Sequence, residues 1–173
     1  MLIKRVITGL FLVFSFLFVL SVPPFHVQSI IFAVVAILGS WEWAGLAGLR
    51  AGLSKLIYST VLLALCCACW LVCDLAEIDG IRSRVRPWLA AAALFWSAML
   101  LGLKYYPSGR WLWRKAYVKA VMGWSILTST WLALVFCLSL PNGRFILFLL
   151  VFLVAVADIV AYFVGQKFGR HPL

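Results

Sequence analysis

The chain has 173 residues, of which 66% are hydrophobic and only 12% are charged, and its mean hydropathy is +1.11. Soluble domains are roughly half apolar and a quarter charged, so this composition excludes a soluble globular protein. The formal net charge is +10, but the basic residues lie between apolar runs, which favours a membrane surface over nucleic acid as their partner.

Six apolar stretches have the length of membrane-crossing helices, because about 20 mostly apolar residues span about 30 Å of hydrocarbon. They cover approximately residues 6–22, 27–49, 54–73, 88–103, 118–140 and 144–165. No linker or repeat divides the chain. The sequence therefore predicts an all-α membrane protein with about six transmembrane helices, in a single polytopic domain over residues 1–173.

Proline and glycine residues mark the expected ends of these helices. Pro23 and Pro24 lack the amide hydrogens that would continue the first helix. Pro87 is expected in the first turn of the fourth helix, where its missing amide costs nothing. The tripeptide Pro-Asn-Gly at 141–143 predicts a tight turn between the last two spans.

The distribution of basic residues predicts the orientation of the chain. Most Lys and Arg residues flank the apolar runs on the side of the N-terminus, and the opposite loop at 74–86 mixes arginines with three acidic residues. Because an excess of Lys and Arg marks the cytoplasmic side, both termini are expected in the cytoplasm. The basic and aromatic loop at 104–119 fits an ordinary interfacial anchor better than a funnel for a lipid substrate.

Two carboxylates lie within the apolar runs, at Glu42 and Asp158. A carboxylate in the bilayer is costly unless it meets a cation, a metal ion or water, so each is a candidate for a functional site. Glu42 lies eight residues before Arg50, and Asp158 nine before Lys167, which predicts a similar depth in the cytoplasmic leaflet.

For Asp158 the functional interpretation is favoured. Helical spacing places Tyr162 and Gly165 on its face, which predicts a polar and small strip turned towards the protein interior. Lys167 and Arg170 follow within a few turns, where a metal-bound phosphate could lie at the membrane surface.

For Glu42 a structural role is favoured, in which it pairs with a buried arginine or with backbone groups and fixes helix packing. Gly39 and Gly45 flank Glu42 and permit close helix approach, and small residues recur at 40, 44, 48 and 52. The five cysteines all lie in apolar runs, and packing is favoured for them over metal or redox chemistry, although Cys66 and Cys69 have CxxC spacing.

The segments "IKRVITGLFLV…VPPFHVQSIIFAVVAILGSWEWAGLAGL" (3–49), "LKYYP" (103–107) and "ADIVAYFVGQKFGRHPL" (157–173) resemble the phosphatidate cytidylyltransferases, the CDP-diacylglycerol synthases of bacterial membranes. The resemblance follows the whole chain in order. It is most specific in the pair WEWAxLxG and AD-x-x-AY-x-x-G-x-x-FG. The sequence departs from the family pattern at Ile159 and Val160, where small or polar residues are usual, and at Gln166, where Arg is frequent.

The resemblance implies a magnesium-dependent transferase of the bacterial cytoplasmic (inner) membrane. Its substrates would be CTP and phosphatidic acid, and its products CDP-diacylglycerol and pyrophosphate, in phospholipid biosynthesis. Asp158 would be a catalytic ligand of Mg²⁺, Lys167 and Arg170 would contact phosphate, and Tyr162 would orient the carboxylate or a lipid headgroup. Membrane lipids are expected partners, and a homodimer is left open.

The family continues beyond this point with further Lys, Asp and Glu signatures, so the chain is expected to be the N-terminal part of a longer enzyme and inactive alone. Two alternatives belong to other classes. One is a small multi-pass membrane protein without catalysis that binds lipid or a partner as a scaffold. The other is a small transporter that uses Glu42 and Asp158 as an ion relay.

Overall fold

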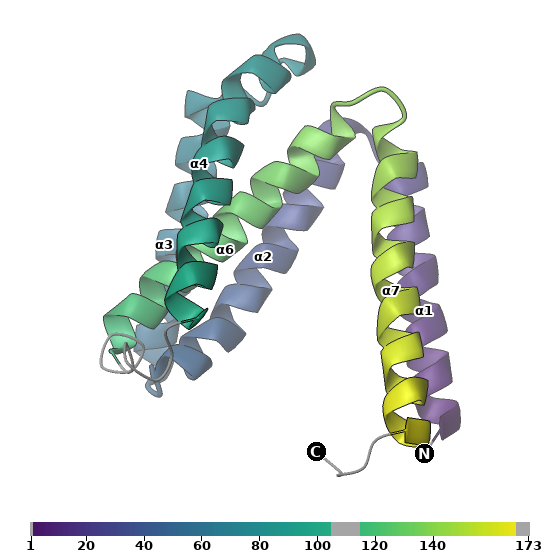
Figure 1. The fold of residues 1–173 in the computed structure, drawn as a ribbon. Helices are drawn as coiled ribbons and strands as arrows, with labels where there is room; N and C mark the ends of the chain where they lie inside the picture. The colour runs from purple at the N-terminus through teal and green to yellow at the C-terminus, as the bar shows by residue number, and fades with distance from the viewer. Residues whose placement is uncertain (1, 105–114, 169–173) are drawn as a thin grey trace. The chain divides into compact units, whose positions relative to one another are not determined.

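The computed structural model describes residues 2–104 and 115–168, and within these ranges every regular element is a helix. This confirms the predicted all-α class. The helices are α1 (Leu2–Ser21), α2 (Phe25–Ala47), α3 (Gly52–Val72), α4 (Ile78–Lys104), α6 (Ala116–Leu138) and α7 (Gly143–Phe168) (Figure 1).

Five of the helices in the described part of the chain are long and apolar enough to cross a membrane, judged by length and composition. These stretches are Phe25–Ala47, Gly52–Val72, Gly80–Gly102, Ala116–Leu138 and Gly143–Gln166. The remaining predicted span, at residues 6–22, corresponds to α1, in which a shorter apolar stretch, Phe11–Ser21, is found. The helices thus follow the six predicted apolar runs in number and order. The orientation predicted for the termini stays a prediction.

The chain folds as two compact units, one made of residues 1–23 and 140–173 and the other of residues 24–139. The first unit is the pair of helices α1 and α7, which lie side by side (Figure 1). The guanidinium group of Arg144 donates hydrogen bonds to the carbonyl oxygens of Ser21, at 3.5 Å, and Pro23, at 3.4 Å. These bonds tie the end of α1 to the start of α7. The predicted turn at 141–143 is present, and Asn142 adopts φ 59° there.

In the second unit α2 packs against both α3 and α6, and α4 packs against α6. Small residues of α2 make this packing close: Ser40 and Ala44 are fully buried, and Gly39 faces Leu127 of α6. The hydroxyl of Ser40 lies 2.8 Å from that of Ser59 on α3 and forms a buried hydrogen bond with it. The predicted close approach around Glu42 is therefore confirmed on the Ser40 side.

Aromatic side chains join the helices of the second unit through hydrogen bonds to backbone carbonyl groups. The indole N–H of Trp43 on α2 donates to Lys119 O on α6 at 2.8 Å. The indole N–H of Trp131 on α6 donates to Ser29 O on α2 at 3.0 Å, inside the core. The Trp43 ring fills the space over Gly123, where a side chain of any size would meet it. These bonds fix the register between α2 and α6.

Two predicted boundaries differ from the structure. The helix α4 begins at Ile78 rather than near residue 88, so Pro87 lies inside it. Its first turns persist because Ile81 and Val85 are fully buried and Arg84 pairs with Asp74 at 2.8 Å. The helix α2 ends at Ala47, because Gly48 adopts φ 99° and caps it. Gly48 and Gly52 therefore lie outside α2 and do not extend the strip of small residues that begins at Ser40 and Ala44.

Candidate functional site

Asp158 lies on α7, fifteen residues after Gly143 and ten before Phe168. At a rise of about 1.5 Å per residue it is about 15 Å from the cytoplasmic end predicted for this helix. Its side chain is exposed in the α1–α7 pair, and no hydrogen bond or ion pair joins it to another described residue. A carboxylate at this depth needs a cation or water, and the functional role of Asp158 stays a prediction.

The other residues predicted around Asp158 are only partly visible. Tyr162 follows it by one turn, and 55% of its surface is exposed. Residues four apart on a helix are neighbours, so the phenol and the carboxylate share one face. Lys167 lies in the last turn of α7, and its side chain lies outside the described set. Arg170 lies outside the described residues. The roles of these residues stay predictions.

The residues of α7 are exposed around Asp158 and for several turns before it. α7 packs against α1, and Phe148, Val151 and Ala155, which precede Asp158, line a cavity of about 340 Å³ with Leu12 and Phe16 of α1. From Leu149 to Gln166 all residues of α7 are exposed in this pair. Both the polar strip and the side predicted to face lipid are therefore uncovered in this pair.

Glu42 lies in the second unit, on an exposed face of α2. Neither an arginine nor a backbone group among the described residues pairs with it. The ammonium group of Lys55 lies over the ring of the neighbouring Trp41, at 5.6 Å from its centroid. The structural role predicted for Glu42 through a buried arginine is not found within the described unit. The equal depth predicted for Glu42 and Asp158 stays a prediction.

The described residues contain no group of three or more His, Cys, Asp or Glu side chains able to hold a metal ion by themselves. A nucleotide-bound Mg²⁺ needs less, because it usually takes one or two carboxylates, with phosphates and waters as its other ligands. The exposed carboxylate of Asp158, which no other described residue pairs with, fits one such position. The five cysteines are all free thiols. Cys66 and Cys73 are buried in the packing of the second unit.

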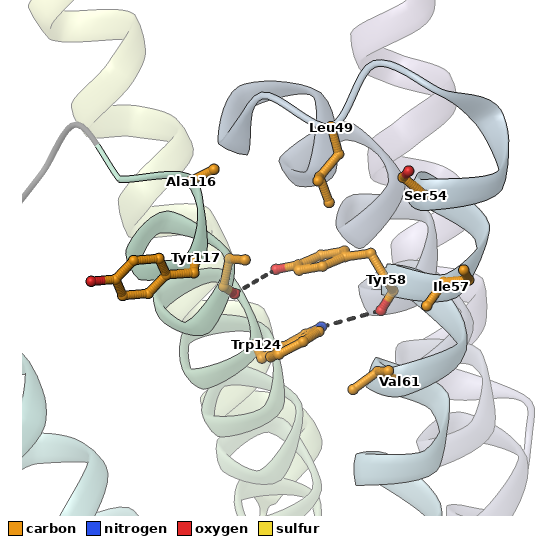
Figure 2. A pocket seen from close by; sticks show the side chains of 9 residues that line it. Leu49, Ser54, Ile57, Tyr58, Val61, Ala116, Tyr117 and Trp124 are labelled. Carbon is orange, nitrogen blue, oxygen red and sulfur yellow. Dashed lines mark hydrogen bonds between the residues drawn. The ribbon is translucent and has the colours of Figure 1, made fainter.

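Sequence reasoning missed a second candidate, between α3 and α6. The rings of Tyr58 and Trp124 stack at 4.9 Å between centroids beside a cavity of about 570 Å³ (Figure 2). The tyrosine hydroxyl donates to Ala120 O at 2.9 Å, and the indole N–H donates to Tyr58 O at 3.1 Å. A pairing of one residue on each of two helices leaves no sequence signal. Only the aromatic and basic composition around residue 117 points to this end of the molecule.

The five apolar spans define a multi-pass helical membrane protein. Residues 3–173 match the model of the cytidylyltransferase family, and the chain belongs to this family. This confirms the resemblance found in the WEWAxLxG and AD-x-x-AY segments.

Two curated relatives are named phosphatidate cytidylyltransferases. The chain is 30% identical over 141 residues to a phosphatidate cytidylyltransferase of Pseudomonas aeruginosa, covering 82% of this chain and 48% of the relative. It is 30% identical over 185 residues to a phosphatidate cytidylyltransferase of Haemophilus influenzae, covering 100% of this chain and 63% of the relative. The chain therefore spans about half to just under two thirds of the length of these relatives. No solved structure gives a significant match.

Proposed function

We propose that the protein transfers a cytidylyl group from CTP to phosphatidic acid in a bacterial membrane. The observation that carries the proposal is the carboxylate of Asp158, which pairs with no other described residue and lies within an apolar span of a chain that belongs to the cytidylyltransferase family. The names of the two relatives supply the substrate class. The membrane spans supply a setting in which a lipid substrate is already at hand.

The chemistry is a displacement at phosphorus. A phosphate oxygen of phosphatidic acid attacks the α-phosphorus of CTP, a new P–O bond forms, and the bond to the bridging oxygen of the β-phosphate breaks. Pyrophosphate leaves with the electron pair of that bond, and CDP-diacylglycerol stays in the leaflet. Such a transfer needs little covalent help and depends on positioning and charge stabilisation.

The residues of α7 fit this requirement. Asp158 would hold Mg²⁺, which when bound supplies positive charge against the phosphate oxygens. Tyr162, one turn away, would orient the carboxylate or the lipid headgroup. Lys167 and Arg170 would bind phosphate oxygens where α7 approaches the membrane surface.

The proposal includes a location in the bacterial inner membrane with both termini in the cytoplasm. CTP is then available on the side to which the basic residues belong. A homodimer is compatible with this arrangement, and the molecular mass of the purified protein in detergent measures it.

The experiment uses membranes that contain the complete gene product, whatever its length, with radiolabelled CTP and added phosphatidic acid. The proposal predicts labelled CDP-diacylglycerol in the lipid phase that depends on phosphatidic acid and on magnesium. Membranes carrying the Pseudomonas relative serve as the positive control. A correctly inserted protein that yields no labelled lipid, while the control membranes do, would overturn the proposal.

A further inference from the structure

A continuous groove runs along α3 and α6 in the second unit. Two cavities form it, the cavity of about 570 Å³ beside Tyr58 and another of about 360 Å³. Trp124 lines both of them, and α3 lines the first as far as Val61 and the second from Leu65, one turn later. The cavities are thus consecutive parts of one groove. Figure 2 shows the first part, with Val61 and Trp124 on facing helices.

The groove has the length and the surface expected for a hydrocarbon chain. It follows α3 from Ser54 to Cys69, fifteen residues, which is about 22 Å at a rise of about 1.5 Å per residue. One leaflet of a bilayer contributes only about 15 Å of hydrocarbon. The lining residues are mostly apolar or aromatic, and the hydroxyl residues are Ser54 in the first part and Ser125, Thr128 and Ser129 in the second. A single acyl chain can therefore lie in the groove over the full depth of its leaflet.

The stacked pair of Tyr58 and Trp124 forms a wall of this groove without offering it a polar group. Their rings are nearly parallel, with 14° between the planes. Their polar hydrogens are used in the hydrogen bonds to Ala120 O and Tyr58 O, as the dashed lines in Figure 2 show. The wall consequently presents ring surface, which favours an apolar occupant.

The end of the groove at Ser54 carries positive charge. Arg50 and Lys115 directly adjoin lining residues in the sequence, and the ammonium group of Lys115 lies 5.6 Å from the centre of the ring of Tyr117, which lines the groove. Lys55 is turned instead towards α2, over the ring of Trp41. Both α3 and α6 begin at this end, and neither start has a side-chain cap. Uncapped helix starts add partial positive charge from their N–H groups.

The acidic residues of the described part of this unit lie elsewhere. Asp74 and Glu77 follow the opposite end of α3, where Arg84 pairs with both of them. Glu42 lies on α2 next to Trp41, and none of these three acidic residues lines the groove. The mouth at Ser54 is therefore cationic, and its charge complements a phosphate group.

We propose that the groove between α3 and α6 binds one anionic diacyl phospholipid. One acyl chain lies along Val61 and Trp124, and the phosphate lies at the cationic mouth with Arg50 and Lys115. The site belongs to the second unit alone and contains no residue assigned to the transfer reaction. A failure of this lipid-binding proposal would therefore leave the proposed cytidylyl transfer unaffected, and the reverse also holds.

The test uses purified protein in detergent and a phosphatidylglycerol that carries a photoreactive diazirine on one acyl chain. After illumination, peptide mass spectrometry locates the cross-links. The proposal predicts labels along Ile57–Leu65 of α3 and on the facing part of α6. Unlabelled phosphatidylglycerol and phosphatidic acid should compete, whereas phosphatidylcholine and glycerol 3-phosphate should not. Equal competition by phosphatidylcholine would overturn the assignment of an anionic lipid.

Matched variants separate the groove from general contact with detergent and lipid. Val61→Trp fills the groove and should reduce cross-linking roughly tenfold, whereas Leu56→Trp changes an exposed position of α3 outside the groove and should leave it unchanged. Equal cross-linking in these two variants would overturn the site. The positions of the cross-links in the unaltered protein are a second readout. Cross-links spread evenly over α2, α4 and α7 would also overturn the proposed site.

The charge of the mouth is tested in the same assay. Replacing Arg50 and Lys115 together by Gln should weaken competition by phosphatidylglycerol roughly 30-fold, because each basic residue near an anionic lipid surface contributes about a factor of five. Arg82→Gln removes a cation beyond the opposite end of α3 and should have no effect. If both replacements act equally, the phosphate does not bind at the mouth.

Discussion

Gly123 is predicted to be the least replaceable glycine of the second unit. A methyl group at this position of α6 would meet the indole of Trp43 and the hydroxyl of Tyr58 directly. Both side chains donate hydrogen bonds to α6 carbonyl groups, at 2.8 Å to Lys119 O and 2.9 Å to Ala120 O. Gly123→Ala therefore cannot be accommodated by moving a flexible side chain, and it should disturb α2, α3 and α6 together.

The expected loss of stability follows from three contributions. Overpacking a well-filled contact costs about 1–3 kcal/mol. Losing two interhelical hydrogen bonds costs about 0.6 kcal/mol each in a membrane protein. The better helix propensity of Ala returns about 1 kcal/mol. The net effect of Gly123→Ala is a decrease of about 2 kcal/mol in the free energy of unfolding.

The assay is unfolding by increasing SDS in mixed micelles, followed by circular dichroism. Gly9→Ala is the control, because nothing lies within 4 Å of a methyl group placed at Gly9, so stability should be unchanged or rise by up to about 1 kcal/mol. Combining Gly123→Ala with Trp43→Ala should cost less than the sum of the two single changes, since the clash with the indole is then absent and only the contact with the Tyr58 hydroxyl is left. If Gly123→Ala unfolds at the same SDS fraction as Gly9→Ala, the described packing of α2 on α6 is wrong.

Two further predictions concern buried groups of the second unit. Ser40→Ala should lower the free energy of unfolding by about 0.6 kcal/mol, and adding Ser59→Ala should cost almost nothing more, because the hydrogen bond that they share is already lost. The control Ser97→Ala removes an exposed hydrogen bond within one helix and should have no effect. Additive losses in the double variant would contradict the pairing. Burial raises the pKa of the Cys73 thiol, and the Arg84 cation opposes this shift. Alkylation of Cys73 by a water-soluble maleimide should therefore be slow at pH 7 and should accelerate as the pH rises. The Cys73→Ser protein gives the background rate. Arg84→Gln should slow it further, and a fast rate that does not change between pH 7 and 9 would contradict the burial.

The sequence predicted the helices well because long apolar runs have few alternatives in a membrane. The turn at Asn142 and the end of α1 before Pro23 were also predictable, since each depends on the backbone preferences of one or two residues. Small residues indicated the packing face of α2 correctly at Ser40 and Ala44. Each of these features is encoded locally.

The errors arose where tertiary packing overrides a local rule. The arginines at 82–86 lower the hydropathy, so the apolar run begins at Pro87, yet buried Ile81 and Val85 extend the helix nine residues towards the N-terminus. Gly48 was assigned to the face of a continuing helix, although its φ of 99° ends α2. The groove between α3 and α6 depends on the meeting of Tyr58 with Trp124, and no spacing within one helix encodes such a contact.

Asp158 was found by a different kind of signal, the cost of an acid in an apolar run. The sequence suggests this residue without naming its partners, because a carboxylate can meet cations from segments far along the chain. In the described α1–α7 pair its face is uncovered. The candidate site is therefore predictable to the level of one residue and one helix face.

The most direct measurement of the central claim is the rate at which membranes carrying the complete gene product form CDP-diacylglycerol when Asp158 is replaced by Asn. This change removes a negative charge at nearly constant shape. We predict a loss of roughly 100-fold or more in turnover with unchanged insertion and unfolding, while the control Glu77→Gln, which removes an exposed carboxylate, keeps full activity. Normal turnover by the Asp158→Asn protein would contradict the role of this carboxylate in the transfer reaction.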